Sequence, residues 1–209
     1  MINNDIFVQI GTNNGNDEFR DLVKKLKPSK IILIEPCKYL NEQIKNNYMG
    51  IENYHIENYA ITNEENRGIV KLCYPKTQEN GKSVNGFTYS DGGYSLIPMD
   101  DWGDDFTVYE CESMTFMEMC QKYDITKITY LQIDTEGYDS EIIKSIDFSK
   151  IEIDKIKYEL WEFPEISYKR HGEKSKLYGL NGMNYIENLL KNIGYTITKD
   201  NTDVTAIKN

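Results

Sequence analysis

Long apolar stretches are missing from this 209-residue sequence. A helix that spans a membrane needs roughly 18 or more consecutive apolar residues, and no such run occurs here. The beginning, MINNDIFVQIG, has no basic region followed by a long apolar core, so we expect no secretory signal. The simplest expectation is a cytoplasmic protein that has no membrane partner.

Cysteine and histidine are also scarce. The four cysteines, at positions 37, 73, 111 and 120, form no CxxC pair, and no histidine cluster lies near them. This spacing argues against a zinc site and against a disulfide framework. We therefore expect reduced thiols that are mostly buried.

Positive charge is in deficit, because 24 Lys and Arg face 34 Asp and Glu and give a net charge of -10. An acidic surface repels nucleic acid backbones and acidic membranes, so a nucleic acid partner is disfavoured. One segment, SYKRHGEKSK, departs from this balance, with Lys169, Arg170, Lys174 and Lys176 opposed only by Glu173. It is either a solvated loop or a small anion-contacting patch.

What the sequence does contain is a repeated alternation of short apolar runs with segments of helical periodicity. It has no internal repeat or low-complexity linker, so we expect one domain over residues 1–209. The expected strands cover 5–10, 30–36, 53–61, 68–75, 106–113, 127–134 and 155–163, with a hairpin over 195–209. The expected helices cover 16–27, 37–48, 114–122, the segment after residue 137, and 183–193.

Strands that alternate with helices indicate an α/β fold, in which a mainly parallel sheet is covered by helices on both faces. The C-terminal hairpin would then place an antiparallel strand at the end of that sheet. Residues 76–105 are polar and rich in Gly, Ser, Asn and Asp, and we interpret them as a loop inserted on the substrate side.

The segment VQIGTNNGN links the first strand to the first helix. Gly11 can turn sharply and let a ligand approach the backbone, and Gly15 lets the helix start close to the strand. Unpaired N–H groups at a helix N-terminus favour a carboxylate or a phosphate. The alternative is an ordinary turn between a strand and a helix.

Glu35 lies at the tip of the second strand, where a carboxylate can accept hydrogen bonds from a ribose diol. Alone it would fit a solvent-facing strand end equally well, but with the glycine loop it indicates a nucleoside-containing cofactor. Asn13 occupies the place of the middle glycine in a GxGxxG motif, so a dinucleotide and an NAD-dependent oxidoreductase are disfavoured. The remaining GxxxG pattern suits a ligand that ends in a carboxylate and an amine, such as S-adenosylmethionine.

The segment YLQIDTEGYDSEII brings two carboxylates to another strand end. Asp134 and Glu136 are placed there for catalysis or substrate contact, although acids also cap helices at such positions. The pair could hold a divalent cation, but no third acid is evident at close spacing, and we assign no metal site.

In this order, VQIGTNNGN, ILIEP, NYAIT, YSLIP and LQIDTEGYDSEII resemble the FkbM-type methyltransferases, over residues from about 5 to 205. The most specific piece is IDTEGYDSEII, which is similar to the family's Asp-x-Glu-Gly segment. The resemblance implies a Rossmann-like class I methyltransferase fold with a seven-stranded sheet. It also implies S-adenosylmethionine as cofactor and O-methylation, mainly of sugars and other small molecules.

The resemblance also assigns site residues by position. Gly11 to Gly15 would hold the methionine end of the cofactor, Glu35 the ribose, and Asn58 to Ile61 would flank the adenine. Gln9 stands where this type of motif is usually acidic, and its amide accepts a hydrogen bond but supplies no charge to a ligand ammonium. The full expected cofactor set is Gln9, Gly11, Thr12, Asn13, Asn14, Gly15, Glu35, Pro36, Asn58, Tyr59, Ala60, Ile61, Ser95 and Asp134.

The implied reaction is in-line attack of a substrate hydroxyl on a sulfonium methyl group, for which a nearby base would help. The candidates are Asp134, Glu136 and His171, of which His171 also fits an exposed loop position. The acceptor should contact residues 76–105 and 162–182, and Trp161 or Phe163 could stack on its ring. The sequence does not name the acceptor or the oligomeric state.

Other functions remain open at this stage. An RNA or nucleotide hydroxyl could be the acceptor, if the segment around Lys169 to Lys176 steers it. A catalytically silent cofactor-binding or interaction protein is a further alternative, which the neutral Gln9 invites.

Overall fold

The computed structural model describes residues 4–75, 94–96, 106–159, 180–200 and 203–209. Within these ranges no helix is both long enough and apolar enough to cross a membrane. The predicted helix near 183–193 and the predicted terminal hairpin are present, as are the strands around residues 5–10 and 30–36. The strand predicted over 127–134 is divided: Tyr130–Ile133 joins the main sheet, whereas Lys127–Ile128 pairs with Glu152–Ile153 in a separate two-stranded sheet. The strand predicted over 155–163 is described only as far as Glu159.

Strands and helices alternate from the start of the chain, as predicted. The first helix begins where the Asp17 side chain accepts a hydrogen bond from the Arg20 backbone N–H, and it ends at Lys27, which is left-handed and precedes Pro28. The elements up to residue 57 are β1 (Ile6–Ile10), α1 (Glu18–Leu26), β2 (Lys30–Ile34), the 3-10 helix η1 (Lys38–Leu40), α2 (Asn41–Asn47) and β3 (Tyr54–Glu57).

The single strand predicted over 53–61 is wrong, because the chain forms two strands there that belong to different sheets. β3 pairs with β2, whereas β4 (Ala60–Thr62) pairs with a later strand. Between them, the Asn58 side chain donates to the Glu35 carbonyl over 2.8 Å. This amide takes the place of the backbone N–H that a continuing parallel strand would supply, so the chain can turn away without leaving that carbonyl unpaired.

The remaining elements complete the fold. They are the 3-10 helix η2 (Glu64–Asn66), β5 (Ile69–Pro75), β6 (Phe106–Thr115), α3 (Phe116–Lys122), β7 (Lys127–Ile128), β8 (Tyr130–Ile133), α4 (Asp139–Lys144), β9 (Glu152–Ile153), β10 (Lys155–Glu159), α7 (Leu180–Asn192), β11 (Tyr195–Lys199) and β12 (Asp203–Lys208).

The main sheet has seven strands in the order β11-β12-β10-β8-β1-β2-β3. All its strands run parallel except β12, which is antiparallel to both of its neighbours. The expected antiparallel strand therefore exists, but it lies inside the sheet and not at its end. Val204 and Ala206 of β12 are fully buried, whereas β11 alternates buried and exposed positions, so the more apolar strand takes the interior place.

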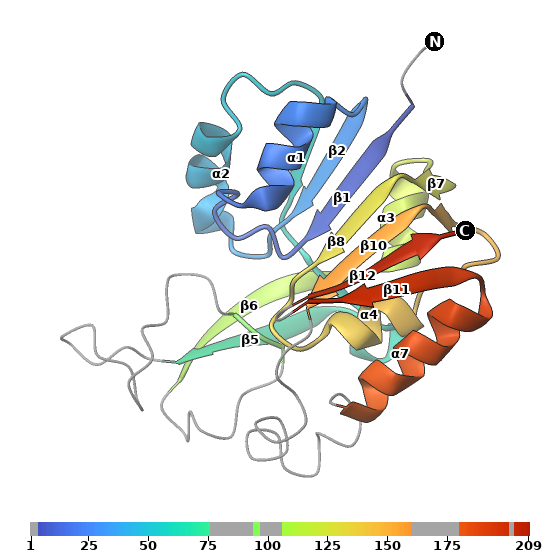
Figure 1. Ribbon diagram of the computed structural model, residues 1–209. Helices are drawn as coiled ribbons and strands as arrows, with labels where there is room; N and C mark the ends of the chain where they lie inside the picture. The colour runs from blue at the N-terminus through green and yellow to red at the C-terminus, as the bar shows by residue number, and fades with distance from the viewer. Residues whose placement is uncertain (1–3, 76–93, 97–105, 160–179, 201–202) are drawn as a thin grey trace.

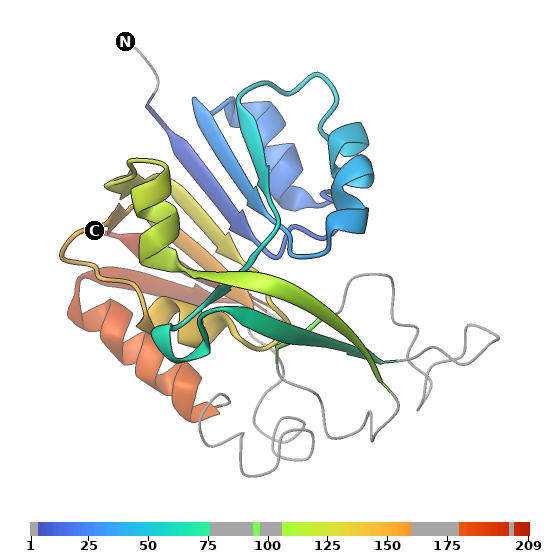
Figure 2. The same ribbon diagram turned by 180° about the vertical axis from the view of Figure 1, so that it is seen from behind.

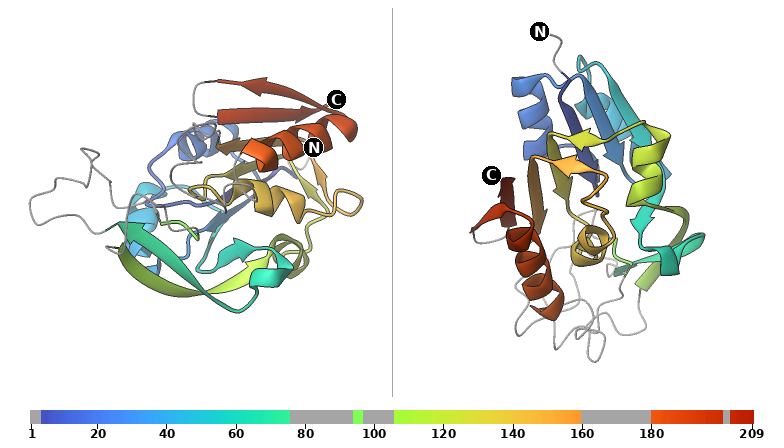
Figure 3. Two further views of the ribbon diagram at one scale, coloured as in Figure 1. Left: turned by 90° about the horizontal axis from the view of Figure 1, so that it is seen from below. Right: turned by 90° about the vertical axis from the view of Figure 1, so that its right-hand side faces the viewer.

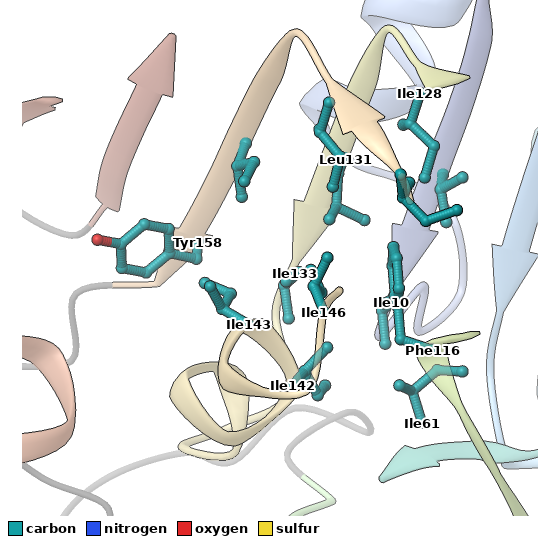
Figure 4. Close-up of a cluster of buried hydrophobic side chains, with 14 of the residues drawn as sticks. Ile10, Ile61, Phe116, Ile128, Leu131, Ile133, Ile142, Ile143, Ile146 and Tyr158 are labelled. Atoms are coloured by element: carbon teal, nitrogen blue, oxygen red, sulfur yellow. The ribbon is translucent and has the colours of Figure 1, made fainter. Parts of the chain in front are cut away.

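Both faces of this sheet are covered, as the α/β prediction requires. Phe7 and Tyr130 pack with Phe19 of α1 and Tyr48 at the end of α2 on one face. On the other face α3, α4 and α7 cover a larger cluster, part of which Figure 4 shows, with Phe116, Leu131, Ile133 and Ile142 among its members. Figure 3 shows α1 and α3 on opposite sides of the strands.

β1 lies at the point where the strand order reverses. The chain passes from β1 to β2 on one side, and β8 and β10 are added later on the other side (Figure 1). In open α/β sheets a ligand crevice forms at the carboxyl ends of the strands at such a reversal. The ends of β1 and β8 are therefore where this topology places a site.

A second, three-stranded sheet in the order β4-β6-β5 adjoins these strand ends. β5 and β6 form a long antiparallel ribbon that crosses in front of the ends of the central strands in Figure 2. Leu72 of β5 is buried against Ala60 and Cys111. This ribbon gives the crevice an apolar wall opposite the main sheet.

Two buried tyrosines provide a test of the packing. The Tyr195 hydroxyl donates to the Ile153 carbonyl over 2.5 Å, whereas the buried Tyr48 hydroxyl has no partner among the described residues. We expect Tyr195→Phe to cost about 1 kcal/mol of unfolding free energy, and Tyr48→Phe to be neutral or stabilising. Urea denaturation of both variants measures this, and an equal loss in the two would contradict the packing.

Candidate active site

A pocket opens at the carboxyl ends of β1, β2 and β8, under the wall formed by β4 and β5. It joins the glycine loop, the tip of β2, the start of β4 and the turn after β8. Its lining residues are Ile10, Gly11, Asn13, Ile34, Glu35, Pro36, Tyr59, Ala60, Ile61, Leu72, Tyr94, Leu96, Asp134, Thr135 and Glu136. The three motifs that the sequence singled out thus meet in one place.

The glycine loop is shaped by tight backbone packing. Gly11 has φ +83°, and a Cβ at this position would lie 1.7 Å from the carbonyl oxygen of Asp134. The backbone N–H groups of Gly11 and Thr12 both donate to the Ile34 carbonyl, over 3.0 and 3.1 Å. Asn13 is left-handed with φ 52°, a conformation that asparagine tolerates better than most residues. Only a glycine fits at residue 11.

Gly15 has a different role from Gly11. It has φ +71°, and a Cβ there would lie 2.9 Å from the Tyr48 ring. The absence of a side chain therefore lets the loop pack against the end of α2 as well as turn into α1.

Glu35 lies in the pocket wall with only 6% of its surface exposed. Its carboxylate accepts hydrogen bonds from the backbone N–H groups of Asn13, over 2.7 Å, and Cys37, over 2.9 Å. Burial raises the pKa of this carboxyl to about 7, and the two N–H donors partly offset the rise. These bonds fix both oxygens while leaving lone pairs for a ligand hydroxyl.

A second acidic group lies across the pocket, at the turn after β8. Burial raises the pKa of Asp134 well above its usual value, and the charges of Glu136 and Asp139 add to the rise. Burial, together with the nearby Asp139, also raises the pKa of Glu136 to about 7. Both residues line the pocket, and the raised pKa of Glu136 lets its carboxyl bind or release a proton near neutral pH.

Asp139 supports this turn from below and is not itself part of the pocket lining. Its carboxylate accepts hydrogen bonds from the Thr135 backbone N–H and from the Glu159 backbone N–H, each over 2.9 Å, and from the Thr135 hydroxyl. It thereby ties the end of β10 to the turn after β8. From the sequence, helix capping was an alternative role for Asp134 and Glu136, and Asp139 was not singled out.

Several residues of the expected cofactor set lie behind the pocket wall. Gln9 is buried and donates to the Asp17 carboxylate over 2.6 Å. Asn58 bonds to the Glu35 carbonyl and to Asn41. The residues of the expected set that do not line the pocket are Gln9, Thr12, Asn14, Gly15, Asn58 and Ser95.

Some pocket residues were not singled out from the sequence. Tyr94 lies in the loop 76–105, which we expected to contact the acceptor; it lines the pocket and packs edge-on against Tyr39 and Tyr109, with ring centroids 6.5 and 6.1 Å away. In a chain with 16 tyrosines a single tyrosine carries little signal. Leu96 lies in the same loop, whereas Leu72, Thr135, Ile10 and Ile34 were missed as pocket residues.

Other predictions concern residues outside the described ranges. His171, Trp161, Phe163 and the basic segment 169–176 lie there, as does most of the loop over 76–105. Among the described residues, no three His, Cys, Asp or Glu side chains form a group that could hold a metal ion. All four cysteines are buried, as expected.

The seven-stranded sheet with one reversed strand, the helices on both faces and the pocket at the strand reversal define a Rossmann-like class I methyltransferase fold. The model of the methyltransferase FkbM domain matches residues 9–197. The chain therefore belongs to the FkbM methyltransferase family, as its motifs predicted.

Three solved structures are similar to this chain. SMU.1697c of Streptococcus mutans, a candidate methyltransferase determined in complex with S-adenosylhomocysteine, is 11% identical with a TM-score of 0.51; the match covers 99% of this chain and 89% of that one. A methyltransferase FkbM from Methylobacillus flagellatus KT is 14% identical with a TM-score of 0.48, covering 97% of this chain and 43% of that one. An rRNA methylase from Streptococcus thermophilus is 13% identical with a TM-score of 0.49, covering 99% and 87%. No curated protein matches the sequence.

Two glycines with the same backbone conformation test the close packing of the loop. Gly50 has φ +80° and open space around its Cα, so Gly50→Ala should cost only the left-handed strain of about 1–2 kcal/mol. Gly11→Ala adds the clash with Asp134 and should cost at least about 2 kcal/mol more, by overpacking. Chemical denaturation of both variants measures the difference, and equal costs would refute the contact.

The raised pKa of Glu35 predicts a pH dependence of stability. The neutral form of Glu35 is favoured in the folded state, so its contribution to the free energy of unfolding is present at low pH and is lost as the pH rises from 4.5 to about 7. Between pH 4.5 and pH 8, the free energy of unfolding of Glu35→Gln should therefore rise by on the order of 3 kcal/mol relative to that of the wild type.

Denaturation at several pH values measures this gain. The exposed Glu42, replaced by Gln, serves as a control that should follow the wild type at every pH. If the unfolding free energies of Glu35→Gln and the wild type differ by the same amount at every pH, the pKa of Glu35 is not raised by burial.

Proposed function

We propose that this protein is an S-adenosylmethionine-dependent methyltransferase that acts on a hydroxyl group of a sugar or another small molecule. The observation that carries the proposal is the meeting of the glycine loop, Glu35 and the acidic pair Asp134 and Glu136 in one pocket. Family membership supports methyl transfer as the reaction. The acceptor class comes from the family resemblance of the motifs.

The residues present fit this cofactor. In the glycine loop, Asn13 lines the pocket, and its Oδ1 is buried without a partner among the described residues. A buried polar atom of this kind is normally satisfied, so it favours a polar ligand group, such as the amino acid end of the cofactor. Gln9 lacks a charge of its own, but it holds the Asp17 carboxylate next to the loop.

The other parts of the cofactor fit the rest of the pocket. Glu35 presents an oriented carboxylate that can accept hydrogen bonds from both hydroxyls of a ribose. Tyr59, Ala60 and Ile61 supply a largely apolar surface for a purine base. When bound, the cofactor supplies a methyl group that is already activated for transfer.

The protein then has to orient the acceptor and receive its proton. An alcohol is a weak nucleophile, and a base within hydrogen-bond reach raises its reactivity. Glu136 has a pKa of about 7, so near neutral pH a large fraction of its carboxyl groups are ionised and can take that proton. Asp134 also lines the pocket and carries a raised pKa, so it is the second candidate base.

The net charge, the cysteines and Gln9 bear on the other candidate functions. The net charge of -10 disfavours an RNA acceptor. Four buried cysteine thiols fit a reducing compartment such as the cytoplasm. A catalytically silent cofactor-binding protein remains the second candidate, favoured by the neutral Gln9 in the loop.

Isothermal titration with S-adenosylmethionine tests the proposal. The wild type should bind with micromolar affinity, and Glu35→Gln should weaken binding at least tenfold, which is about 1.4 kcal/mol. The wild-type affinity should also rise between pH 6 and pH 8, because the ribose hydroxyls donate to the ionised form of Glu35, whose pKa is about 7.

Glu42→Gln is the matched control, since Glu42 is an exposed acid on the neighbouring helix and should leave the affinity unchanged. NADH in place of the cofactor should give no heat of binding. Wild-type protein that shows no binding to S-adenosylmethionine would refute the proposal and favour an interaction protein.

A further inference from the structure

The short segment Tyr94–Leu96 is fastened to the edge of the pocket by its backbone. The Cys73 N–H donates to the Ser95 carbonyl over 2.7 Å, and the Ser95 N–H donates to the Cys73 carbonyl over 3.0 Å. Ser95 is completely buried between its two pocket-lining neighbours, Tyr94 and Leu96. Ser95 therefore sits behind the wall that these neighbours present to the pocket.

The hydroxyl of Ser95 reaches across to the turn that follows β8. It donates to the Glu136 carbonyl over 2.8 Å, a contact between residues 41 positions apart in the chain. The turn contains two consecutive residues with positive φ, Glu136 at 54° and Gly137 at 105°. For a residue with a long side chain, such as Glu136, the left-handed conformation is uncommon and persists only where its surroundings hold it.

Ser95 and Asp139 hold this turn from two sides. Asp139 accepts hydrogen bonds from Thr135, at the start of the turn, and Ser95 donates to Glu136 in its middle. The direction of the Glu136 side chain follows from the backbone of this turn. A change in the turn that moves the Glu136 Cα would break the bond to Ser95 and move the carboxyl relative to Asp134.

We propose that Ser95 is a positioning residue, which holds the Glu136 carbonyl so that the Glu136 carboxyl stays in the pocket. This role differs from the cofactor contact that the motif resemblance assigned to Ser95. A role in catalysis rests on the proposed function, in which Glu136 takes the proton of the acceptor hydroxyl. The geometric claim stands on the unliganded protein alone.

The titration of Glu136 reports its position directly. The carboxyl groups that interact with it are Asp139 on α4 and Asp134 at the end of β8, and Glu35 and Tyr94 line the same pocket. Its pKa of about 7 comes mainly from burial. A carboxyl that swings toward solvent should titrate closer to its usual 4.5.

The experiment is a 13C NMR titration of glutamate carboxyl groups in the full-length, unliganded protein, with the Glu136 signal assigned by its loss in Glu136→Gln. Ser95→Ala should lower the pKa of Glu136 by at least about one unit. Ser95→Thr, which keeps a hydroxyl, should restore it. Ser145→Ala should have no effect, because the Ser145 hydroxyl also donates to a backbone carbonyl, that of Ile142, but within its own helix region.

An unchanged Glu136 titration in Ser95→Ala would overturn the proposal, even if the melting temperature fell, because Ser95 would then support the fold without placing the carboxyl. If Ser95→Ala does not fold, Ser95→Cys replaces the hydroxyl with a side chain of similar size that is a weaker donor. A lowered pKa of Glu136 in Ser95→Cys would then support the proposal, and an unchanged pKa would overturn it.

Cofactor binding separates this role from direct contact. Ser95→Ala should bind S-adenosylmethionine within about threefold of the wild type, roughly 0.7 kcal/mol. A tenfold loss would assign Ser95 to the cofactor site and overturn the positioning role. Absence of binding by the wild type would refute the proposed function, yet the titration would still decide whether Ser95 places Glu136.

Discussion

The site depends on the contact between the Cα of Gly11 and the carbonyl oxygen of Asp134, where no side-chain atom fits. This contact brings the loop after β1 directly against the turn after β8. Because the loop is held there, the N–H of Asn13 reaches Glu35, and the carboxyl ends of β1, β2 and β8 enclose one pocket. A larger residue at position 11 would separate the three motifs.

The pocket collects buried carboxyl groups in spite of the cost of burying charge. Glu35 and Glu136 both have raised pKa values near neutrality, and Asp139 is buried below the turn. Folding stability alone would favour apolar residues at such places. Their concentration at one end of the sheet is typical of a site where hydroxyl groups are bound and protons are moved.

Much of the fold could be predicted from the sequence, because short apolar runs indicate the buried strands, and apolar spacing with a capping residue indicates the helix α1. The failures arose where side chains replace backbone partners or where contacts join distant segments. Asn58 ends β3 by imitating a backbone donor, and no periodicity signals that. Ser95 and Tyr94 reach the site only through the bridge to Cys73, which no local pattern predicts. The motifs indicated Glu35 and Asp134. Which residues of each motif line the pocket, and which lie behind those that do, depends on tertiary packing.

The interior position of β12 constrains how the sheet can be assembled. β11 hydrogen-bonds within the main sheet only to β12, and β12 in turn pairs with β10. β11 therefore cannot join the sheet on its own, even though it precedes β12 in the chain. The edge must be added as a preformed hairpin or after β12 has docked, so the sheet cannot be completed before the whole hairpin has been synthesised.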